Sequence, residues 1–122
     1  MIQRVIVAGG RDFRDFELLK KSLDELLDTS TGIEIISGHA SGADSLAEKY
    51  ANENGIKLTI MPAEWNLYGR AAGPMRSRRM LAYAMELSNS CLIAFWDGKS
   101  KGTKNMISQA EKAGISCTVI NY

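Results

Sequence analysis

The sequence contains few of the residues that build metal sites and nucleophilic sites. Its 122 residues include one histidine and two cysteines. Cys91 and Cys117 lie far apart, each within an apolar run, so their spacing is not that of a zinc site and both are expected to be buried, reduced thiols in strands. His39 could contact a phosphate, but it has no second histidine as a partner. The sequence therefore predicts no metal site and no cofactor.

Strong net charge and long apolar segments are also absent. The formal net charge is +1, which argues against a protein that coats nucleic acid and leaves only local basic patches as binding sites. No apolar run is long enough to cross a membrane, and no signal peptide is recognisable. We therefore expect a cytoplasmic protein with no membrane partner. With 45% hydrophobic residues, the chain is expected to form one domain over residues 1–122, with its own core.

Apolar runs typical of strands alternate with helical repeats along the whole chain. Residues 63–73 are expected to be irregular, and Pro74 is expected at the first position of the helix that follows. The predicted strands cover residues 4–8, 33–36, 57–61, 91–95 and 116–120, and the predicted helices cover residues 15–28, 43–54, 74–87 and 103–113.

Strands that alternate with helices form a parallel sheet with helices on both faces. Because the crossover connections are right-handed, the simplest arrangement is a doubly wound sheet of five strands in the order 3-2-1-4-5. The sequence thus predicts an α/β fold with a switch point between the first and fourth strands. Ligands of such sheets bind beyond the carboxyl ends of the strands at that point. Three loops meet there, formed by residues 9–13, 37–44 and 96–103.

The loop of residues 37–44, Ser-Gly-His-Ala-Ser-Gly-Ala-Asp, joins a strand to a helix. Free backbone N–H groups and the helix dipole make such a turn suitable for binding phosphate. The alternative is an ordinary turn in which Ser41 or Asp44 caps the helix. Asp44 would repel a phosphate, so we expect it to be a cap or the acceptor for a ribose hydroxyl beside the phosphate.

Two further loops combine glycines with basic residues. Gly9 and Gly10 allow close approach to the end of the first strand, and Arg11 could bind a phosphate or form a solvated pair with Asp12. The G-x-G-x-x-G fingerprint is absent, which argues against nicotinamide or flavin chemistry. Residues 98–104 do not match a Walker loop, but the helix start at Gly102-Thr103 could bind phosphate.

Residues 70–79 contain four arginines and no acidic residue. Arg76 and Arg79 share one helical face, which is either a binding surface or a solvated one. Trp65 and Tyr68 lie just before it, where an aromatic ring could stack on a base or cover the core. The same helix is rich in apolar residues, which are either core or part of a homodimer or larger homo-oligomer. These residues are Met75, Met80, Leu81, Met85 and Leu87.

Taken together, the motifs resemble those of the SLOG superfamily of Rossmann-like domains, and most closely its small YspA/YpsA-related group. The resemblance covers nearly the whole chain. It implies a nucleotide or nucleotide derivative as ligand, which the protein senses or processes, and a homo-oligomer. The residues that carry it are Gly9-Gly10-Arg11-Asp12-Phe13, Ser37-Gly38-x-Ala40-x-Gly42-Ala43-Asp44, Ala63-x-Trp65, Gly69-x-Ala71-Ala72-Gly73-x-x-Arg76 and Gly102-Thr103.

Two related families imply different activities. Residues 37–44 resemble a loop of the DNA-processing (Smf) proteins, which bind single-stranded DNA, but Ser77 stands where their Pro-x-Arg-Asn-Arg segment has asparagine. Arg76-x-x-x-Met80 and Gly102-Thr103 are similar to motifs of the Lonely Guy phosphoribohydrolases. In those enzymes a catalytic glutamate follows the Gly-Thr pair by three positions, where this chain has Met106. That difference weighs against hydrolase activity.

We expect the protein to bind a phosphorylated nucleoside or nucleotide derivative, and so to sense or sequester it, rather than to act as an enzyme. One alternative is an N-glycoside hydrolase or transferase acting on nucleotides, with Glu64 or Asp44 as the candidate catalytic carboxylate. The other is a protein that binds single-stranded nucleic acid, which the low net charge does not favour. The predicted ligand-binding residues are Gly9, Gly10, Arg11, Asp12, Ser37, Gly38, His39, Ser41, Gly42, Asp44, Trp65, Arg76, Gly102 and Thr103.

Overall fold

Five parallel strands form one sheet in the order β3-β2-β1-β4-β5 in the computed structural model, which describes residues 2–28 and 30–122. β1 pairs in parallel with both β2 and β4, so the switch point lies between β1 and β4. The predicted doubly wound α/β fold and its strand order are therefore confirmed. The strands are β1 (Ile2–Gly9), β2 (Gly32–Ser37), β3 (Lys57–Ile60), β4 (Ser90–Trp96) and β5 (Ser116–Asn121).

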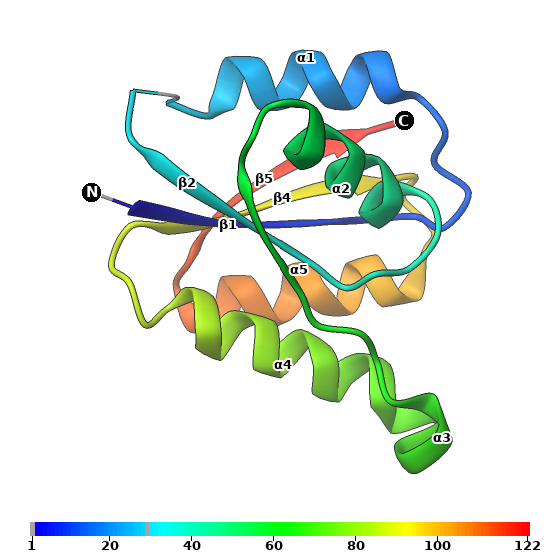
Figure 1. Ribbon diagram of the computed structural model, residues 1–122. Coiled ribbons are helices and arrows are strands. Elements are labelled where there is room, and N and C mark those ends of the chain that lie inside the picture. Colours follow the sequence, from blue (N-terminus) through cyan, green and yellow to red (C-terminus); the bar gives the residue numbers. More distant parts are fainter. Residues whose placement is uncertain (1, 29) are drawn as a thin grey trace.

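Two pairs of helices cover the two faces of the sheet (Figure 1). α1 (Phe16–Leu26) and α2 (Ala43–Glu53) pack on one face, and α4 (Ala72–Ala84) and α5 (Lys101–Ala113) pack on the other. The central strand alternates between the two resulting cores: Val5 and Val7 belong to the first and Ile6 to the second, and all three are 0% exposed. This alternation explains why β1 is apolar throughout its middle.

The segment between β3 and α4 differs from the prediction. Residues 63–73 were expected to be irregular, but they contain the short helix α3 (Trp65–Tyr68), the 3-10 turn η1 (Gly69–Ala71) and the start of α4. Pro74 is the third residue of α4 and not the first. A proline fits there because the first N–H groups of a helix have no intrahelical acceptor. Figure 1 shows α3 projecting beyond the end of α4, away from the sheet.

Helix α5 begins two residues earlier than predicted. The Ser100 hydroxyl accepts a hydrogen bond from the Thr103 N–H at 3.4 Å and so caps the helix, which places Lys101 and Gly102 in its first turn. Asp97 shapes the preceding loop, because its Oδ1 accepts hydrogen bonds from the N–H groups of Lys99 and Ser100, both at 2.8 Å. The sequence pattern predicted a helix start in this region, but at Thr103 instead of Lys101.

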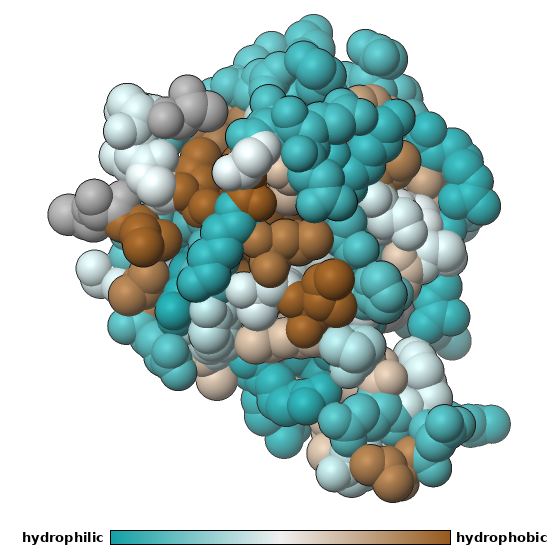
Figure 2. Space-filling model, in the orientation of Figure 1, coloured by the Kyte–Doolittle hydropathy of each residue, from teal (hydrophilic) through white to brown (hydrophobic). Residues whose placement is uncertain are grey.

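Several apolar side chains remain exposed outside the core, among them residues of α3 and β3. On α3 the exposed fractions are 47% for Trp65 and 72% for Leu67, and on β3 Ile60 is 43% exposed. Figure 2 shows apolar residues on the projecting α3 and on the face around β3. Of the apolar residues of α4, Met80 and Leu81 are buried in the chain's own core. None of the described helices has the length and apolarity needed to cross a membrane.

Candidate ligand-binding cleft

A cavity of about 740 Å³ opens at the carboxyl ends of the central strands. Its lining comes from the loops that follow β1, β2 and β4 and from the first turns of α4 and α5. The volume lies within the range of small-molecule sites, roughly 300–1,000 Å³. Most of the predicted ligand-binding residues line it, namely Gly9, Gly10, Arg11, Asp12, Gly38, Asp44, Trp65, Arg76, Gly102 and Thr103.

Three of the predicted residues lie beside the cavity and hold the 37–44 loop in place. Ser37 is 0% exposed, and its hydroxyl donates a hydrogen bond to Glu48 Oε2 at 2.7 Å. His39 also turns to Glu48, with Nδ1 3.0 Å from Oε2, and it has a positive φ of 59°. The Ser41 hydroxyl donates to the Arg11 carbonyl oxygen at 3.4 Å. In this structure these side chains tie the loop to α2 and to the β1–α1 loop, and they do not face the cavity.

Gly42, the fourth, allows two loops to touch. Its φ is 78°, and a Cβ atom built there would lie 2.2 Å from the Gly10 carbonyl oxygen. That carbonyl accepts a hydrogen bond from the Ala43 N–H at 3.1 Å, at the start of α2. The glycine is needed both for its conformation and for this close approach. The contact brings Arg11, on one loop, to the same cavity as Asp44, on the other.

Asp44 and Arg76 are both attached to the turn that follows β2. Asp44 Oδ2 accepts a hydrogen bond from the Ala40 N–H at 3.1 Å, and Arg76 donates to the Gly38 carbonyl oxygen at 2.7 Å. Burial raises the pKa of Asp44 to about 6, although the Ala40 N–H and the charge of Arg76 act in the opposite direction. Gly42, not Asp44 or Ser41, occupies the N-cap position of α2. The capping role considered for Asp44 and Ser41 was therefore wrong.

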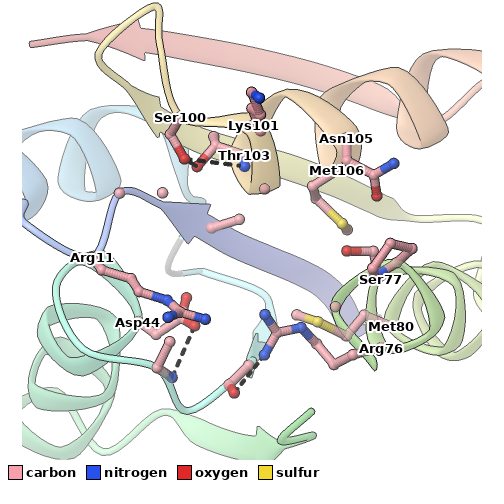
Figure 3. Close-up of a pocket in the computed structure, with 18 of the residues that line it drawn as sticks. Arg11, Asp44, Arg76, Ser77, Met80, Ser100, Lys101, Thr103, Asn105 and Met106 are labelled. Carbon is pink, nitrogen blue, oxygen red and sulfur yellow. Dashed lines mark hydrogen bonds between the residues drawn. The ribbon is translucent and has the colours of Figure 1, made fainter. Parts of the chain in front are cut away.

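Three guanidinium groups line the cavity, and those of Arg11 and Arg76 face one another across it without an ion pair among the described residues. Within the described residues, no carboxylate oxygen lies within 4.0 Å of a side-chain nitrogen of Arg11 or Arg76. In Figure 3 the two groups point toward one another from opposite sides of the cavity, with Asp44 beside them. Burial lowers the pKa of Arg76; the charge of Asp44 acts in the opposite direction, and the charge of Arg11 lowers the pKa further. An anion between the two guanidinium groups would offset their mutual repulsion and could accept hydrogen bonds from both.

The first turn of α5 adds positive potential to another wall of the cavity. Lys101, Gly102 and Thr103 all belong to the lining. N–H groups in the first turn of a helix lack intrahelical partners and carry the positive end of the helix dipole. A Cβ atom built on Gly102 would meet nothing within 4 Å, so this wall is open to a ligand.

The sequence reasoning missed the apolar wall between α4 and α5. Met80 and Met106 line the cavity there, each only 3% exposed, together with Ser77 at 6%. Ser77 and Met106 had been noted only in comparison with other families, and Met80 had also been considered as a core or oligomer residue. Helical spacing could have identified Ser77 and Met80 as neighbours, because they are three positions apart on α4. Met106 comes from a separate helix, and its proximity requires the fold.

The two candidate catalytic carboxylates lie in different surroundings. Asp44 lines the cavity and is 6% exposed. Glu64 lies just before α3, outside the set of residues that line the cavity, and its Oε1 is 3.6 Å from Arg79 on α4. A carboxylate that attacks or stabilises a sugar must reach it. Of the two candidates, Asp44 lines the cavity and Glu64 does not.

Comparison with known proteins identifies the family. The model of the YspA, cpYpsA-related SLOG family, named YAcAr, matches residues 3–68, which is more than half of the chain. The chain belongs to this SLOG family. The expected resemblance is thereby confirmed. The match covers the loops after β1 and β2, whereas α4 and α5, with Arg76 and the Gly102-Thr103 helix start, lie beyond it.

Two individual proteins are similar to this SLOG protein over nearly its full length. Gene 61 protein of Mycobacterium phage D29 is 33% identical over 127 residues, which span 99% of this chain and 97% of that protein. The X-ray structure of DNA processing protein A (DprA) from Streptococcus pneumoniae superposes with a TM-score of 0.54 at 16% identity. The superposition covers 96% of this chain and 58% of that one. At this identity the second likeness concerns the fold alone.

Proposed function

We propose that the cleft binds a phosphorylated nucleoside or nucleotide derivative and that the protein senses or sequesters this ligand. The observation that carries the proposal is the pair of guanidinium groups, Arg11 and Arg76, that face the cavity without a carboxylate partner within 4.0 Å among the described residues. Guanidinium groups bind phosphate oxygens through charge-assisted hydrogen bonds. Membership of the SLOG family supports a nucleotide-related role.

Asp44 fits the sugar rather than the phosphate of such a ligand. One of its carboxylate oxygens is engaged by the Ala40 N–H at 3.1 Å, and the side chain lines the cavity. An ionised carboxylate accepts hydrogen bonds and repels phosphate oxygens. In the proposed complex, the phosphate lies between the two arginines, and a ribose hydroxyl donates to Asp44.

The alternative enzyme would cleave the N-glycosidic bond of a nucleotide. Asp12, Asp44 and Asp97 are carboxylates that line the cavity, and Met106 stands where the phosphoribohydrolases that the sequence resembles have their glutamate. Methionine can neither attack a sugar nor stabilise positive charge on it. We therefore expect little or no release of free base when the protein is incubated with nucleoside monophosphates.

A second candidate function is the binding of single-stranded nucleic acid. It is favoured by the fold likeness to DNA processing protein A and by α3, which exposes Trp65 and Tyr68 at 47% each next to exposed Arg70. Aromatic rings with nearby arginines can stack on the bases of a single strand. The net charge of +1 does not support extended contact with a phosphate backbone.

Arginine substitutions on α4 test the proposal. Replacing Arg76 by glutamine removes a charged contact that lines the cavity, whereas Arg78, on the same helix, is exposed and does not line it. Arg76→Gln should weaken nucleotide binding by roughly 1.5–3 kcal/mol, the usual value for a hydrogen bond to a charged group. Arg78→Gln should leave binding unchanged. Calorimetric titration with nucleoside monophosphates measures both, and equal losses in the two variants would contradict the proposal.

A further inference from the structure

One wall of the cavity is apolar and has no part in holding the phosphate. It lies between α4 and α5, where Met80 and Met106 are each 3% exposed. Figure 3 shows Ser77 and Met80 on one helix and Met106 on the other, bordering the same space. We call the part of the cavity bounded by Ser77, Met80 and Met106 the thioether slot.

The Ser77 hydroxyl is the polar group of this slot, and it has no hydrogen-bond partner among the described residues. The residue is 6% exposed, and no hydrogen bond joins its hydroxyl to another described residue. In the described part of the chain, every fully enclosed side-chain nitrogen or oxygen has a hydrogen-bond partner, so the Ser77 hydroxyl must be open to the cavity. A hydroxyl that lines a largely apolar slot can both donate and accept a hydrogen bond.

Two thioethers and one hydroxyl suit a flat aromatic ring with a polar edge. Methionine sulfur contacts aromatic rings favourably, and methionine side chains adapt to the shape of a ring. Small-molecule sites commonly combine an apolar lining with a few polar groups that fix the orientation of the ligand. A nucleobase has this combination, because its faces are apolar and its edge carries donors and acceptors.

We infer that the thioether slot holds the base of the bound nucleotide and that the Ser77 hydroxyl forms a hydrogen bond to the edge of that base. This inference rests on the proposed function, since it places one part of the proposed ligand. Ser77 directly follows Arg76 on α4, so one helix contacts both the phosphate and the base. Ser77 is then a specificity-determining residue, because it favours bases with a polar edge atom within hydrogen-bonding distance of its hydroxyl.

The indole of Trp65 is the competing place for the base. It also lines the cavity, but it is 47% exposed, and the Arg11 guanidinium already lies 5.5 Å from its ring centroid. The slot, in contrast, carries the Ser77 hydroxyl, which lines the cavity and has no hydrogen-bond partner among the described residues. This unpartnered hydroxyl, which could fix the edge of a base, is the reason for choosing the slot.

Calorimetric titration with ribose 5-phosphate and with the four common nucleoside monophosphates separates the contribution of the base. In the native protein, at least one nucleotide should bind more tightly than ribose 5-phosphate. Ser77→Ala should weaken the binding of that nucleotide by about two- to tenfold, which is the equivalent of one hydrogen bond. It should leave the binding of ribose 5-phosphate unchanged. Ser108→Ala is the matched control on α5, since Ser108 does not line the cavity, and should change neither.

A bulky variant and a tryptophan variant complete the experiment. Ser77→Leu should fill the slot and abolish the advantage of nucleotides over ribose 5-phosphate, and thermal unfolding confirms that each variant is folded. Nucleotides that bind native protein no more tightly than ribose 5-phosphate would overturn the inference and leave the proposed function standing. Unchanged nucleotide affinity in Ser77→Ala, with the loss found instead in Trp65→Leu, would place the base on the indole. Failure of every phosphorylated ligand to bind would overturn both proposals.

Discussion

At the scale of single residues, Asp44 places a carboxylate in the cleft at a cost to the stability of the fold. The side chain is 6% exposed, and burial raises its pKa to about 6. Keeping it ionised at neutral pH therefore costs free energy of folding. The Ala40 N–H and the charges of Arg76 and Arg11 offset part of that cost. A buried carboxylate with a raised pKa in a cleft is typical of a residue retained for binding or catalysis.

The cost of this charge can be measured with Asp44→Asn. Between pH 4 and pH 6 the folded protein holds a proton that the unfolded chain releases, so the contribution of Asp44 to stability falls as the pH rises through this range. Asparagine keeps an oxygen for the Ala40 N–H but carries no charge. The variant should therefore exceed the native protein in free energy of unfolding at pH 7.5, by roughly 3 kcal/mol at most. In urea unfolding, this gain in the free energy of unfolding should vanish at pH 4. An equal gain at pH 4 and pH 7.5 would contradict the prediction.

At the scale of elements, the cleft depends on how closely the loops after β1 and β2 approach. Gly42 has a φ of 78°, and a Cβ there would collide with the Gly10 carbonyl oxygen, 2.2 Å away. Gly9 is similarly crowded, since a Cβ would lie 2.6 Å from both the Ala43 Cβ and the Phe95 carbonyl oxygen. Glycines here permit contact between backbone segments. The close packing of these loops is observed, and the binding of phosphate by residues 37–44 stays a prediction.

Two glycine substitutions separate packing from backbone conformation. Gly114, at the end of α5, has a φ of 80° with nothing within 4 Å of a built Cβ. Gly114→Ala should cost about 1–2 kcal/mol for the left-handed conformation alone. Gly42→Ala should cost clearly more, because it adds a backbone clash, and it should also weaken nucleotide binding. Chemical denaturation compares the two variants, and equal costs would show that the loops separate without penalty.

The sequence predicted the elements that long patterns specify and missed those that depend on tertiary contacts. Alternating apolar runs and helical repeats were sufficient for the five strands and their order. The short helix α3 has no apolar period to detect, since it contains four residues, 65–68. The apolar wall at Met106 was missed because its partner residues come from α4. Likewise, the attachment of Ser37 and His39 to Glu48 follows from the position of α2 in the fold.

At the scale of the whole molecule, charge distinguishes a small ligand from a nucleic acid. The net charge is +1, and the cavity-lining guanidinium groups are Arg11, Arg70 and Arg76. Binding of a nucleoside monophosphate should weaken only slightly between 50 and 200 mM salt, because few counterions are released. Single-stranded DNA held through several phosphates would lose affinity steeply over about the same range. Tight, strongly salt-dependent binding to a single strand would favour the nucleic-acid function.

The association of chains stays a prediction. Met80 and Leu81, two of the apolar residues that suggested a homo-oligomer, are buried in the chain's own core. Met85 on the α4 side and Leu67 on α3 remain exposed, at 44% and 72%. We expect light scattering at micromolar concentration to report a dimer or larger assembly. A monomer would show that this apolar surface does not drive association.

The central claim is that the cleft between the two arginines binds the phosphate of a nucleotide. The most direct test is a crystal structure determined with a bound nucleoside monophosphate. The account predicts that phosphate oxygens lie within hydrogen-bonding distance of the guanidinium groups of both Arg11 and Arg76. A nucleotide whose phosphate contacts neither arginine would contradict the account.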